Sequence, residues 1–245
     1  EELARGLVVE PYMPTVVLCG GILNRHASKE QQETHLPSLI AGESIWALAY
    51  SEPQGRFNLA DIVTSAKADG AGFVLNGTKA VVQGGPWADK LIVSARVSGG
   101  QRDQDGVSLF IVDKSAAGVS TQDYPTVDGG RACEVTLENV AVGADALIGE
   151  AGKGFAILDE AIDYGIGALS AEAVGHMKQL NDATVEYCKT RKQFGVAIGS
   201  FQVLQHRMVD MFMEYEQSVS MTYMVNMKLE DARDDRIKAS SGAKV

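Results

Sequence analysis

The chain has 245 residues, enough to bury a substantial core as one large domain or two modest ones. Its formal net charge of −10 argues against phosphate-rich partners such as nucleic acid, although locally placed Arg and Lys side chains can still bind an anionic cofactor. No apolar run reaches the roughly 18 residues of a membrane span, and the three scattered cysteines lack metal-ligand spacing. We therefore expect a cytoplasmic protein with free thiols and with no metal site, membrane span or nucleic-acid partner.

Residues 1–45 are predicted to be helical, because apolar side chains at 16–18 and 22–23 supply one face. Ser28, followed by acidic and amide residues, is expected to cap the start of a helix. Gly42 ends the stretch.

Residues 46–150 change to short strands separated by loops rich in Gly and Asp, with strands expected at 91–97, 107–112 and 133–137. Asn76-Gly77 lies between two apolar triplets and predicts a two-residue hairpin of type I′. Strands at this spacing are typical of a compact antiparallel barrel or sandwich. No glycine-rich loop follows a strand in the G-x-G-x-x-G pattern, so a Rossmann unit is not expected.

From residue 151 onward, apolar side chains recur every three or four positions. This period predicts a long helix over 155–187, a second over 200–225 that Ser200 caps, and a third that begins near Ile237. The whole chain is therefore predicted to be α+β. Tight helix packing and space for a ligand both explain the glycines inside the first long helix, which are Gly165, Gly167 and Gly175.

The loop between these long helices carries the most informative side chains. Residues 191–195 read Arg-Lys-Gln-Phe-Gly, and residues 201–206 read Phe-Gln-Val-Leu-Gln-His. Arg can fork onto phosphate oxygens, Phe offers a stacking face, and Gln bonds polar edges. The combination suits an anionic cofactor that bears a ring.

Five further stretches are informative: Leu-Ala-Tyr-Ser-Glu-Pro at 48–53, Leu-Asn-Gly-Thr-Lys at 75–79, the segment 87–93, Gly130-Arg131 and Leu147-Ile148-Gly149. With these stretches, the loop resembles the acyl-CoA dehydrogenase family over nearly the whole chain. In that family, residues 1–45 correspond to the end of an N-terminal helical domain, 46–150 to the middle β-domain and 151–245 to the first part of a C-terminal helical domain. The chain thus looks truncated at both ends, and it is most similar to the bacterial branch of pimeloyl-CoA dehydrogenase small subunits.

The resemblance implies an FAD enzyme that converts an acyl-CoA thioester to the trans-2-enoyl-CoA. A carboxylate base takes the α-proton, and the flavin accepts the β-hydrogen as hydride. The implied acceptor is an electron-transfer flavoprotein, and the implied setting is fatty acid or dicarboxylic acid degradation in a bacterial cytoplasm.

Residue by residue, the resemblance implies that Tyr50 and Ser51 contact the flavin edge and that Gln83 stands where the family has a flavin shelf. Arg191 matches the arginine on the FAD pyrophosphate, Phe194 the ring near the adenine, and Gln202 a polar contact beside it. In the family the last three reach the flavin of a neighbouring subunit, so a dimer or tetramer, homomeric or heteromeric, is implied.

Departures from the family pattern concern the substrate. Phe57 replaces a serine that contacts the CoA or acyl portion, and Arg56 beside it is a candidate for a distal carboxylate or a plain solvent-exposed cation. Asp163 is a further candidate for substrate contact, or an ion-paired side chain. The catalytic base is not identified: a minority of members carry it where Gly165 stands, and most carry a Glu that would follow Val245 here.

Two alternatives remain open from the sequence. The chain could be a non-catalytic or half-site partner subunit of a heteromeric dehydrogenase. The family places a tryptophan in the flavin shelf, and residues 81–83 here read Val-Val-Gln. It could also be an oxidase or flavin monooxygenase of the same fold. No residue reports the length or polarity of the acyl chain.

Overall fold

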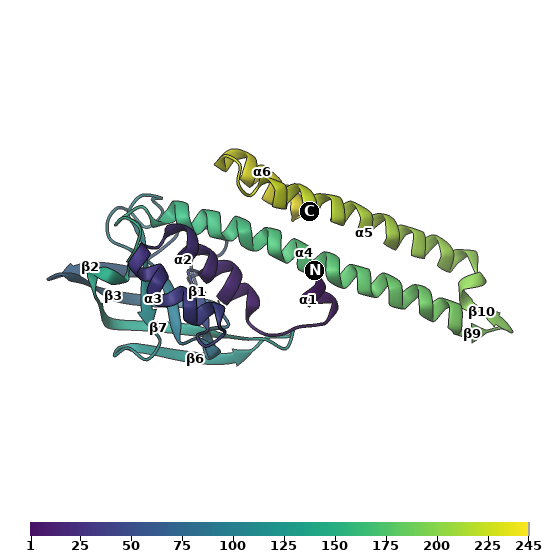
Figure 1. The fold of residues 1–245 in the computed structure, drawn as a ribbon, viewed down its shortest axis with the longest axis horizontal. Helices are drawn as coiled ribbons and strands as arrows, with labels where there is room; N and C mark the ends of the chain where they lie inside the picture. Colours follow the sequence, from purple (N-terminus) through teal and green to yellow (C-terminus); the bar gives the residue numbers. More distant parts are fainter. Residues whose placement is uncertain (245) are drawn as a thin grey trace. The chain divides into compact units, whose positions relative to one another are not determined.

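A computed structural model describes residues 1–244 (Figure 1). The chain forms two compact units: one is Val9–Ile162, and the other joins Glu1–Val8 to the residues from Asp163 onward. The first is a β-sheet with covering helices, and the second is helical apart from one short hairpin. The predicted α+β fold, with N-terminal helices, a β-sheet domain and C-terminal helices, is confirmed. None of the helices within residues 1–244 has the length and apolar composition needed to cross a bilayer.

An eight-stranded sheet is the framework of the first unit. Its strands follow the order β6-β7-β3-β2-β4-β5-β8, and β1 pairs with β4 beside this path. The pairing of β1 with β4 and a single β2–β4 bridge are parallel, and the other ladders are antiparallel. The strands are β1 (Trp46–Ala49), β2 (Ser65–Asp69), β3 (Gly72–Gln83), β4 (Lys90–Arg96), β5 (Val107–Asp113), β6 (Val119–Pro125), β7 (Arg131–Val142) and β8 (Leu147–Ile148).

The sheet is strongly curved. The rings of Phe73 on β3 and Phe110 on β5 lie 5.0 Å apart, although β2 and β4 separate their strands. In a flat sheet those strands would be roughly 14 Å apart. The sheet predicted as a barrel or sandwich does not close into a barrel: β8 has only two residues, and within residues 1–244 it does not pair with β6 at the other end of the strand order.

Helices cover the convex face of the curved sheet. Trp46 and Leu48 of β1 pack into this helical layer, whereas Ala47 and Ala49 belong to the core on the concave face. The alternation is that of a strand buried on both sides. The covering helices are a π-helix at Met13–Gly20, α2 (Gly21–His26) and α3 (Lys29–Ile40) (Figure 1).

The predicted helix cap at Ser28 is confirmed. The Ser28 hydroxyl accepts a hydrogen bond from the Gln31 N–H, and the Gln31 side chain accepts one from the Ser28 N–H. This reciprocal capping box fixes the start of α3. The Gln31 amide also donates to the carbonyls of Asp145 and Leu147, which ties α3 to the chain around β8.

The predicted hairpin at Asn76-Gly77 is wrong, because β3 runs through both residues. The ladder to β7 shifts register between Leu75 and Gly77, and Gly77 has a φ of 154°. A Cβ on Gly77 would lie 2.4 Å from Thr64 Oγ1. The glycine therefore serves a bulge and a close backbone contact, which are the other common reasons for glycine in a strand.

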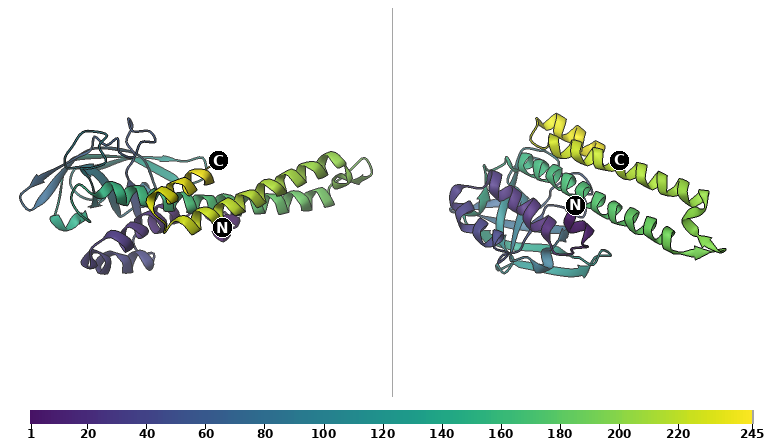
Figure 2. Two further views of the ribbon diagram at one scale, coloured as in Figure 1. Left: turned by 90° about the horizontal axis from the view of Figure 1, so that it is seen from above. Right: turned by 45° about the vertical axis from the view of Figure 1, so that its right-hand side comes forward.

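In the second unit, α4 (Gly154–Thr190) and α5 (Gln202–Lys228) run side by side in opposite directions (Figures 1 and 2). A Cβ on Gly167 of α4 would lie 3.0 Å from Asn226 Oδ1 of α5, and one on Gly175 would lie 2.4 Å from the Glu1 carbonyl oxygen. Helix packing therefore accounts for both glycines. The remaining helices are α1 (Glu2–Arg5) and α6 (Arg233–Ala243), and α6 packs on α5.

The predicted cap at Ser200 is wrong. Helix α5 begins at Gln202 after Phe201, and no side chain caps it. The Ser200 hydroxyl instead donates to the Ala197 carbonyl at 2.7 Å. Local bonding of this kind competes with capping for serine hydroxyls.

Candidate functional site

The turn that follows β1 carries Tyr50 and Ser51. Both residues are half-buried, and burial raises the pKa of the Tyr50 phenol. The Ala80 N–H of β3 donates to the Ser51 carbonyl at 2.9 Å, which fixes the turn against that strand. The two residues predicted to contact a flavin edge are thus adjacent to the middle of β3.

Beneath this turn lies a buried ion pair. Lys79 Nζ donates to Glu52 Oε1 at 2.6 Å and to Ser94 Oγ at 3.0 Å, and both charged side chains are fully buried. The backbone N–H groups of Val63 and Thr64 donate to the two carboxylate oxygens. Removing one partner of such a pair leaves an uncompensated buried charge.

Burial disfavours the charged form of both side chains, and the attraction between them opposes this effect. Burial lowers the pKa of Lys79 to about 8, against the opposing attraction of Glu52. Burial acts to raise the pKa of Glu52, but Lys79 and the donated hydrogen bonds outweigh it, so that pKa lies below its ordinary value. The network therefore stabilises an ionised Glu52, whereas at Lys79 burial outweighs the attraction of Glu52.

Arg56 and Phe57, predicted to contact substrate, lie on the loop that follows Pro53. Arg56 has a φ of 48°, and Phe57 is 100% exposed. Buried Asp61 anchors the base of the loop, since its carboxylate accepts from the Gln101 amide at 2.6 Å and from Arg102 at 2.7 Å. These hydrogen bonds hold the pKa of Asp61 below its ordinary value. An exposed cation and ring therefore stand on a fixed base.

Gln83 lies at the end of β3, where the strand presents side chains to solvent. A register shift between Lys79 and Val82 gives Val81 a φ of 54° and leaves its side chain 56% exposed. Within residues 1–244, neither the Ser51 hydroxyl nor the Gln83 amide has a hydrogen-bond partner. Two available polar groups near an exposed apolar side chain can bond the edge of a ring and cover part of its face.

Arg191 and Phe194 lie on the hairpin that joins α4 to α5. Strand β9 (Lys192–Gln193) pairs with β10 (Val196–Ala197), and the tip residues Phe194 and Gly195 have φ values of 55° and 84°. Positive φ at both central residues is type I′ geometry. This backbone costs an L-residue about 1–2 kcal/mol, and the Phe194 ring is 92% exposed. Strain and exposure in one residue motivate a functional hypothesis for the ring.

Gln202 is close to this hairpin, as the exposed first residue of α5. The preceding Phe201 meets the Phe194 ring edge-on, with centroids 6.1 Å apart. The Ile198 N–H donates to the Arg191 carbonyl at 2.9 Å, which closes the base of the hairpin. Arg191, Phe194 and Gln202 are thus brought to one end of the helical unit (Figure 1).

Two acidic residues of α4 are held by partners. Asp163, 5% exposed, accepts from Arg236 Nε at 2.8 Å and from Ser240 Oγ at 2.7 Å, so both of its oxygens are bonded to α6. A substrate contact by Asp163 stays a prediction. Glu160 pairs with Arg25 at 3.0 Å and faces His26 Nε2 at 3.3 Å. Neither carboxylate is available in the manner of a general base.

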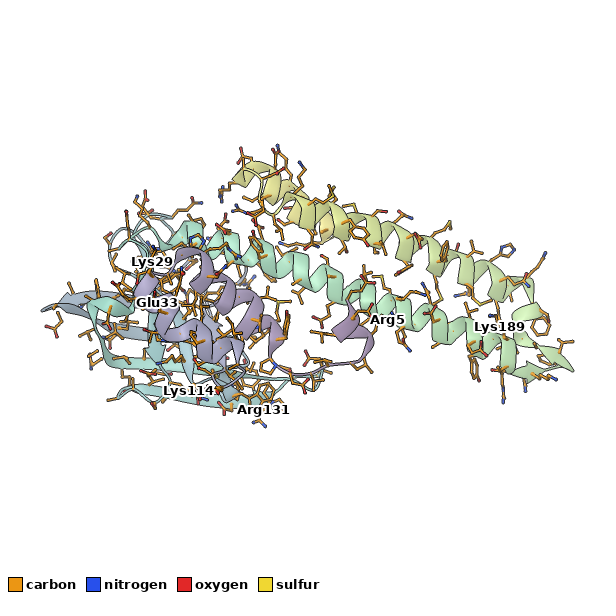
Figure 3. The ribbon with its side chains drawn as sticks, in the orientation of Figure 1. Arg5, Lys29, Glu33, Lys114, Arg131 and Lys189 are labelled. Carbon is orange, nitrogen blue, oxygen red and sulfur yellow. The ribbon has the colours of Figure 1, made fainter. Side chains whose placement is uncertain are left out.

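A groove of about 490 Å³ lies between α4 and α5, and Met208, Met211 and Phe212 contribute apolar side chains to it. Lys189, labelled in Figure 3, lines the groove near the end of α4. None of the residues predicted to bind cofactor or substrate lines this groove. The residues predicted to bind the cofactor therefore form two groups outside the groove, one on the β-sheet unit and one at the hairpin, and Asp163 on α4 belongs to neither group.

Two models of one family match the chain, in order. The model of the acyl-CoA dehydrogenase middle domain matches residues 47–140, and that of the acyl-CoA dehydrogenase C-terminal domain matches residues 152–245. The chain belongs to the acyl-CoA dehydrogenase family.

Three known proteins are similar to this one over almost its whole chain. Mitochondrial isovaleryl-CoA dehydrogenase of Oryza sativa subsp. japonica is 34% identical over 243 residues, which are 96% of this chain and 59% of that protein. A solved FAD-dependent dehydrogenase superposes with a TM-score of 0.91 at 27% identity, over 98% of this chain and 65% of that one. The prolyl acyl carrier protein oxidase AnaB superposes with a TM-score of 0.87 at 28% identity, over 98% and 65%. The chain spans less than two thirds of each of these proteins.

For this acyl-CoA dehydrogenase chain, sequence reasoning missed what Glu52 and Lys79 do. Glu52 in the segment 48–53 and Lys79 in the segment 75–79 are separate signals of the family in the sequence. In the structure they form one buried ion pair. A signal was present: Lys79 precedes Ala80, Val81 and Val82 in a strand, where a charge is expensive unless it is paired.

Proposed function

We propose that the whole protein catalyses the FAD-dependent α,β-dehydrogenation of an acyl-CoA thioester to the trans-2-enoyl-CoA. The observation that carries the proposal is the match of two consecutive acyl-CoA dehydrogenase domains. The similarity to an isovaleryl-CoA dehydrogenase supports acyl-CoA as the substrate class. The proposal includes an electron-transfer flavoprotein as acceptor and a role in fatty acid or dicarboxylic acid degradation in the cytoplasm of a bacterium.

The residues present fit an FAD. Near the Tyr50–Ser51 turn, the Ser51 hydroxyl and the Gln83 amide are available for the polar edge of the isoalloxazine ring, and exposed Val81 offers an apolar contact to its face. The Arg191 guanidinium matches a pyrophosphate, to which it can donate two parallel hydrogen bonds. The Phe194 ring offers a stacking face for the adenine. When bound, FAD would supply the acceptor for the β-hydrogen.

Arg191, Phe194 and Gln202 are proposed to reach the FAD of a neighbouring subunit. An exposed ring at the tip of a hairpin suits such a contact, because a second surface would bury it and recover the apolar area that it now exposes. The proposed protein is accordingly a dimer or tetramer.

The α-proton requires a carboxylate base, and we assign that role to a Glu outside residues 1–245. Partners hold both Asp163 and Glu160, which supports this assignment. Arg56 and Phe57 are proposed to contact the substrate, because both are exposed on a loop whose base is fixed next to the Ser51 turn. An arginine there would favour an acyl group that ends in a carboxylate.

An oxidase is the second candidate, and the similarity to AnaB favours it. The two reactions share substrate activation and differ in how the reduced flavin is reoxidised.

The test measures bound flavin, anaerobic reduction of a dye acceptor by a series of acyl-CoA esters, and oxygen consumption without the dye. We expect bound FAD and dye reduction with slow oxygen consumption. Rapid oxygen consumption that needs no dye would establish the oxidase instead. A flavin-free protein that reduces no dye would leave only the partner-subunit role, and the proposal would be wrong.

A further inference from the structure

Three polar side chains meet inside the β-sheet unit, at a place where the surrounding core is apolar. Glu52 follows the turn after β1, Lys79 lies on β3 and Ser94 on β4, and their exposed fractions are 3%, 0% and 0%. Burying polar groups and charges in an apolar core is unfavourable even when they are hydrogen-bonded to one another. The cluster is too deeply buried to touch a ligand itself.

Each of the three residues is connected to the Tyr50–Ser51 turn, by a hydrogen bond or through a neighbouring residue in the chain. Ser94 Oγ, which accepts from Lys79, lies 3.4 Å from the Tyr50 carbonyl oxygen and donates to it. The Ala80 N–H, next along β3 from Lys79, donates to the Ser51 carbonyl at 2.9 Å. Glu52 is the residue that follows Ser51. The backbone of the turn is therefore held at Tyr50, Ser51 and Glu52 in succession.

Stability alone does not account for this arrangement. Apolar residues of similar volume often replace a buried ion pair without loss of stability, and sometimes with a gain. What an apolar cluster could not do is fix the Tyr50 carbonyl through a hydroxyl or anchor the residue after Ser51 through a carboxylate. The specific effect of the polar cluster is thus to fix the backbone geometry of the Tyr50–Ser51 turn.

We propose that Lys79 is a positioning residue for the flavin, and that it acts through Glu52 and Ser94 on the Tyr50–Ser51 turn. The inference rests on the proposed function, because the turn is the part of the β-sheet unit assigned to the flavin edge. Lys79 fixes the backbone of the turn that carries Ser51 before the cofactor binds, which lowers the ordering cost of binding.

The test compares two variants with a control. Ser94→Ala removes the hydroxyl that joins Lys79 to the Tyr50 carbonyl and leaves both charges paired. The double variant Glu52→Gln/Lys79→Met removes both charges and leaves no orphaned one. The control is Leu91→Val, which trims a buried side chain of the same strand on the opposite face of the sheet from Ser94. Measurements are the melting temperature, the Kd for FAD, and the visible circular dichroism and midpoint potential of the bound flavin.

We expect the wild type to bind FAD, and we expect Ser94→Ala and the double variant to bind it at least about tenfold more weakly, with an altered visible dichroism or potential. Leu91→Val should lose a comparable few degrees of melting temperature and keep the Kd and the flavin signals. If folded Ser94→Ala keeps all the flavin properties of the wild type, the inference is wrong and the proposed function stands. If the wild type binds no FAD, the proposed function fails and the inference fails with it.

Discussion

The Tyr50–Ser51 turn and the Phe194 hairpin, which carry the two groups of candidate FAD residues, are held by different means. Hydrogen bonds and a buried ion pair hold the turn from below. The hairpin has two-residue strands, a strained tip and exposed side chains from Arg191 to Val196. A change beneath the turn should therefore cost stability as well as binding, whereas a change at the hairpin tip should weaken binding without a loss of stability.

The largest effect is expected for Lys79→Met. Because Glu52 would stay buried without its partner charge, the free energy of unfolding should fall by about 3–5 kcal/mol, as measured by urea denaturation. The matched control is Lys90→Met on β4, whose pair with Asp113 is partly exposed. That change should cost no more than about 1 kcal/mol. Equal losses in the two variants would contradict a specific role for the buried pair.

The bulge of β3 gives the next largest effect. In Gly77→Ala the new methyl group would meet Thr64, and the free energy of unfolding should fall by about 1–3 kcal/mol through overpacking. The control is Gly70→Ala, where φ is also positive but no atom lies within 4 Å of the new methyl group. If both variants lose the same amount, backbone strain alone explains Gly77 and the contact with Thr64 does not.

Acid should weaken the β-sheet unit partly through Glu52. Its pKa is lower in the folded chain than the ordinary value of 4.5, so its contribution to stability is complete above pH 4.5 and is lost as the pH falls through the folded pKa. Glu52→Gln should therefore show a shallower loss of stability than the wild type below pH 4.5. Denaturation curves at a series of pH values measure both slopes, and parallel slopes would mean that Glu52 titrates as an ordinary carboxyl.

At the hairpin tip, in contrast, we expect a substitution to weaken FAD binding without lowering stability. Asn tolerates a left-handed backbone better than Phe, so Phe194→Asn should leave stability unchanged or raise it by up to about 1 kcal/mol. Loss of the stacking ring should weaken FAD binding by about tenfold, as measured by flavin fluorescence titration. Phe194→Tyr, which keeps the ring, should bind FAD like the wild type. A clear loss of stability in Phe194→Asn would show that the ring serves the fold.

Much of the fold could be predicted because periodicity and local capping are short-range effects. The long helix before Arg191, the strands of the sheet and the Ser28 cap follow from patterns within a few residues. Asn76-Gly77 shows the limit of such patterns. Its sequence suits a type I′ turn, but Thr64 and β7, distant in sequence, make the same glycine a bulge. The type I′ turn formed at Phe194-Gly195, where Phe gives no signal for it.

Some residues of the candidate site could likewise be predicted from short-range patterns, and others could not. Arg191, Phe194 and Gln202 could be grouped from the sequence because they lie within twelve consecutive residues. The contacts among Glu52, Lys79 and Ser94 could not, since three strands must first be paired before these side chains meet. The partners of Asp163 on α6 were hidden for the same reason.

The central claim is that this chain binds FAD through an arginine at the base of the hairpin, and the most direct measurement is an FAD titration of the wild type, Arg191→Lys and Arg191→Ala. The account predicts tight binding by the wild type, a Kd at least about tenfold higher for Arg191→Ala, an intermediate Kd for Arg191→Lys, and equal melting temperatures for all three without FAD. Equal FAD affinity in the wild type and Arg191→Ala would contradict it.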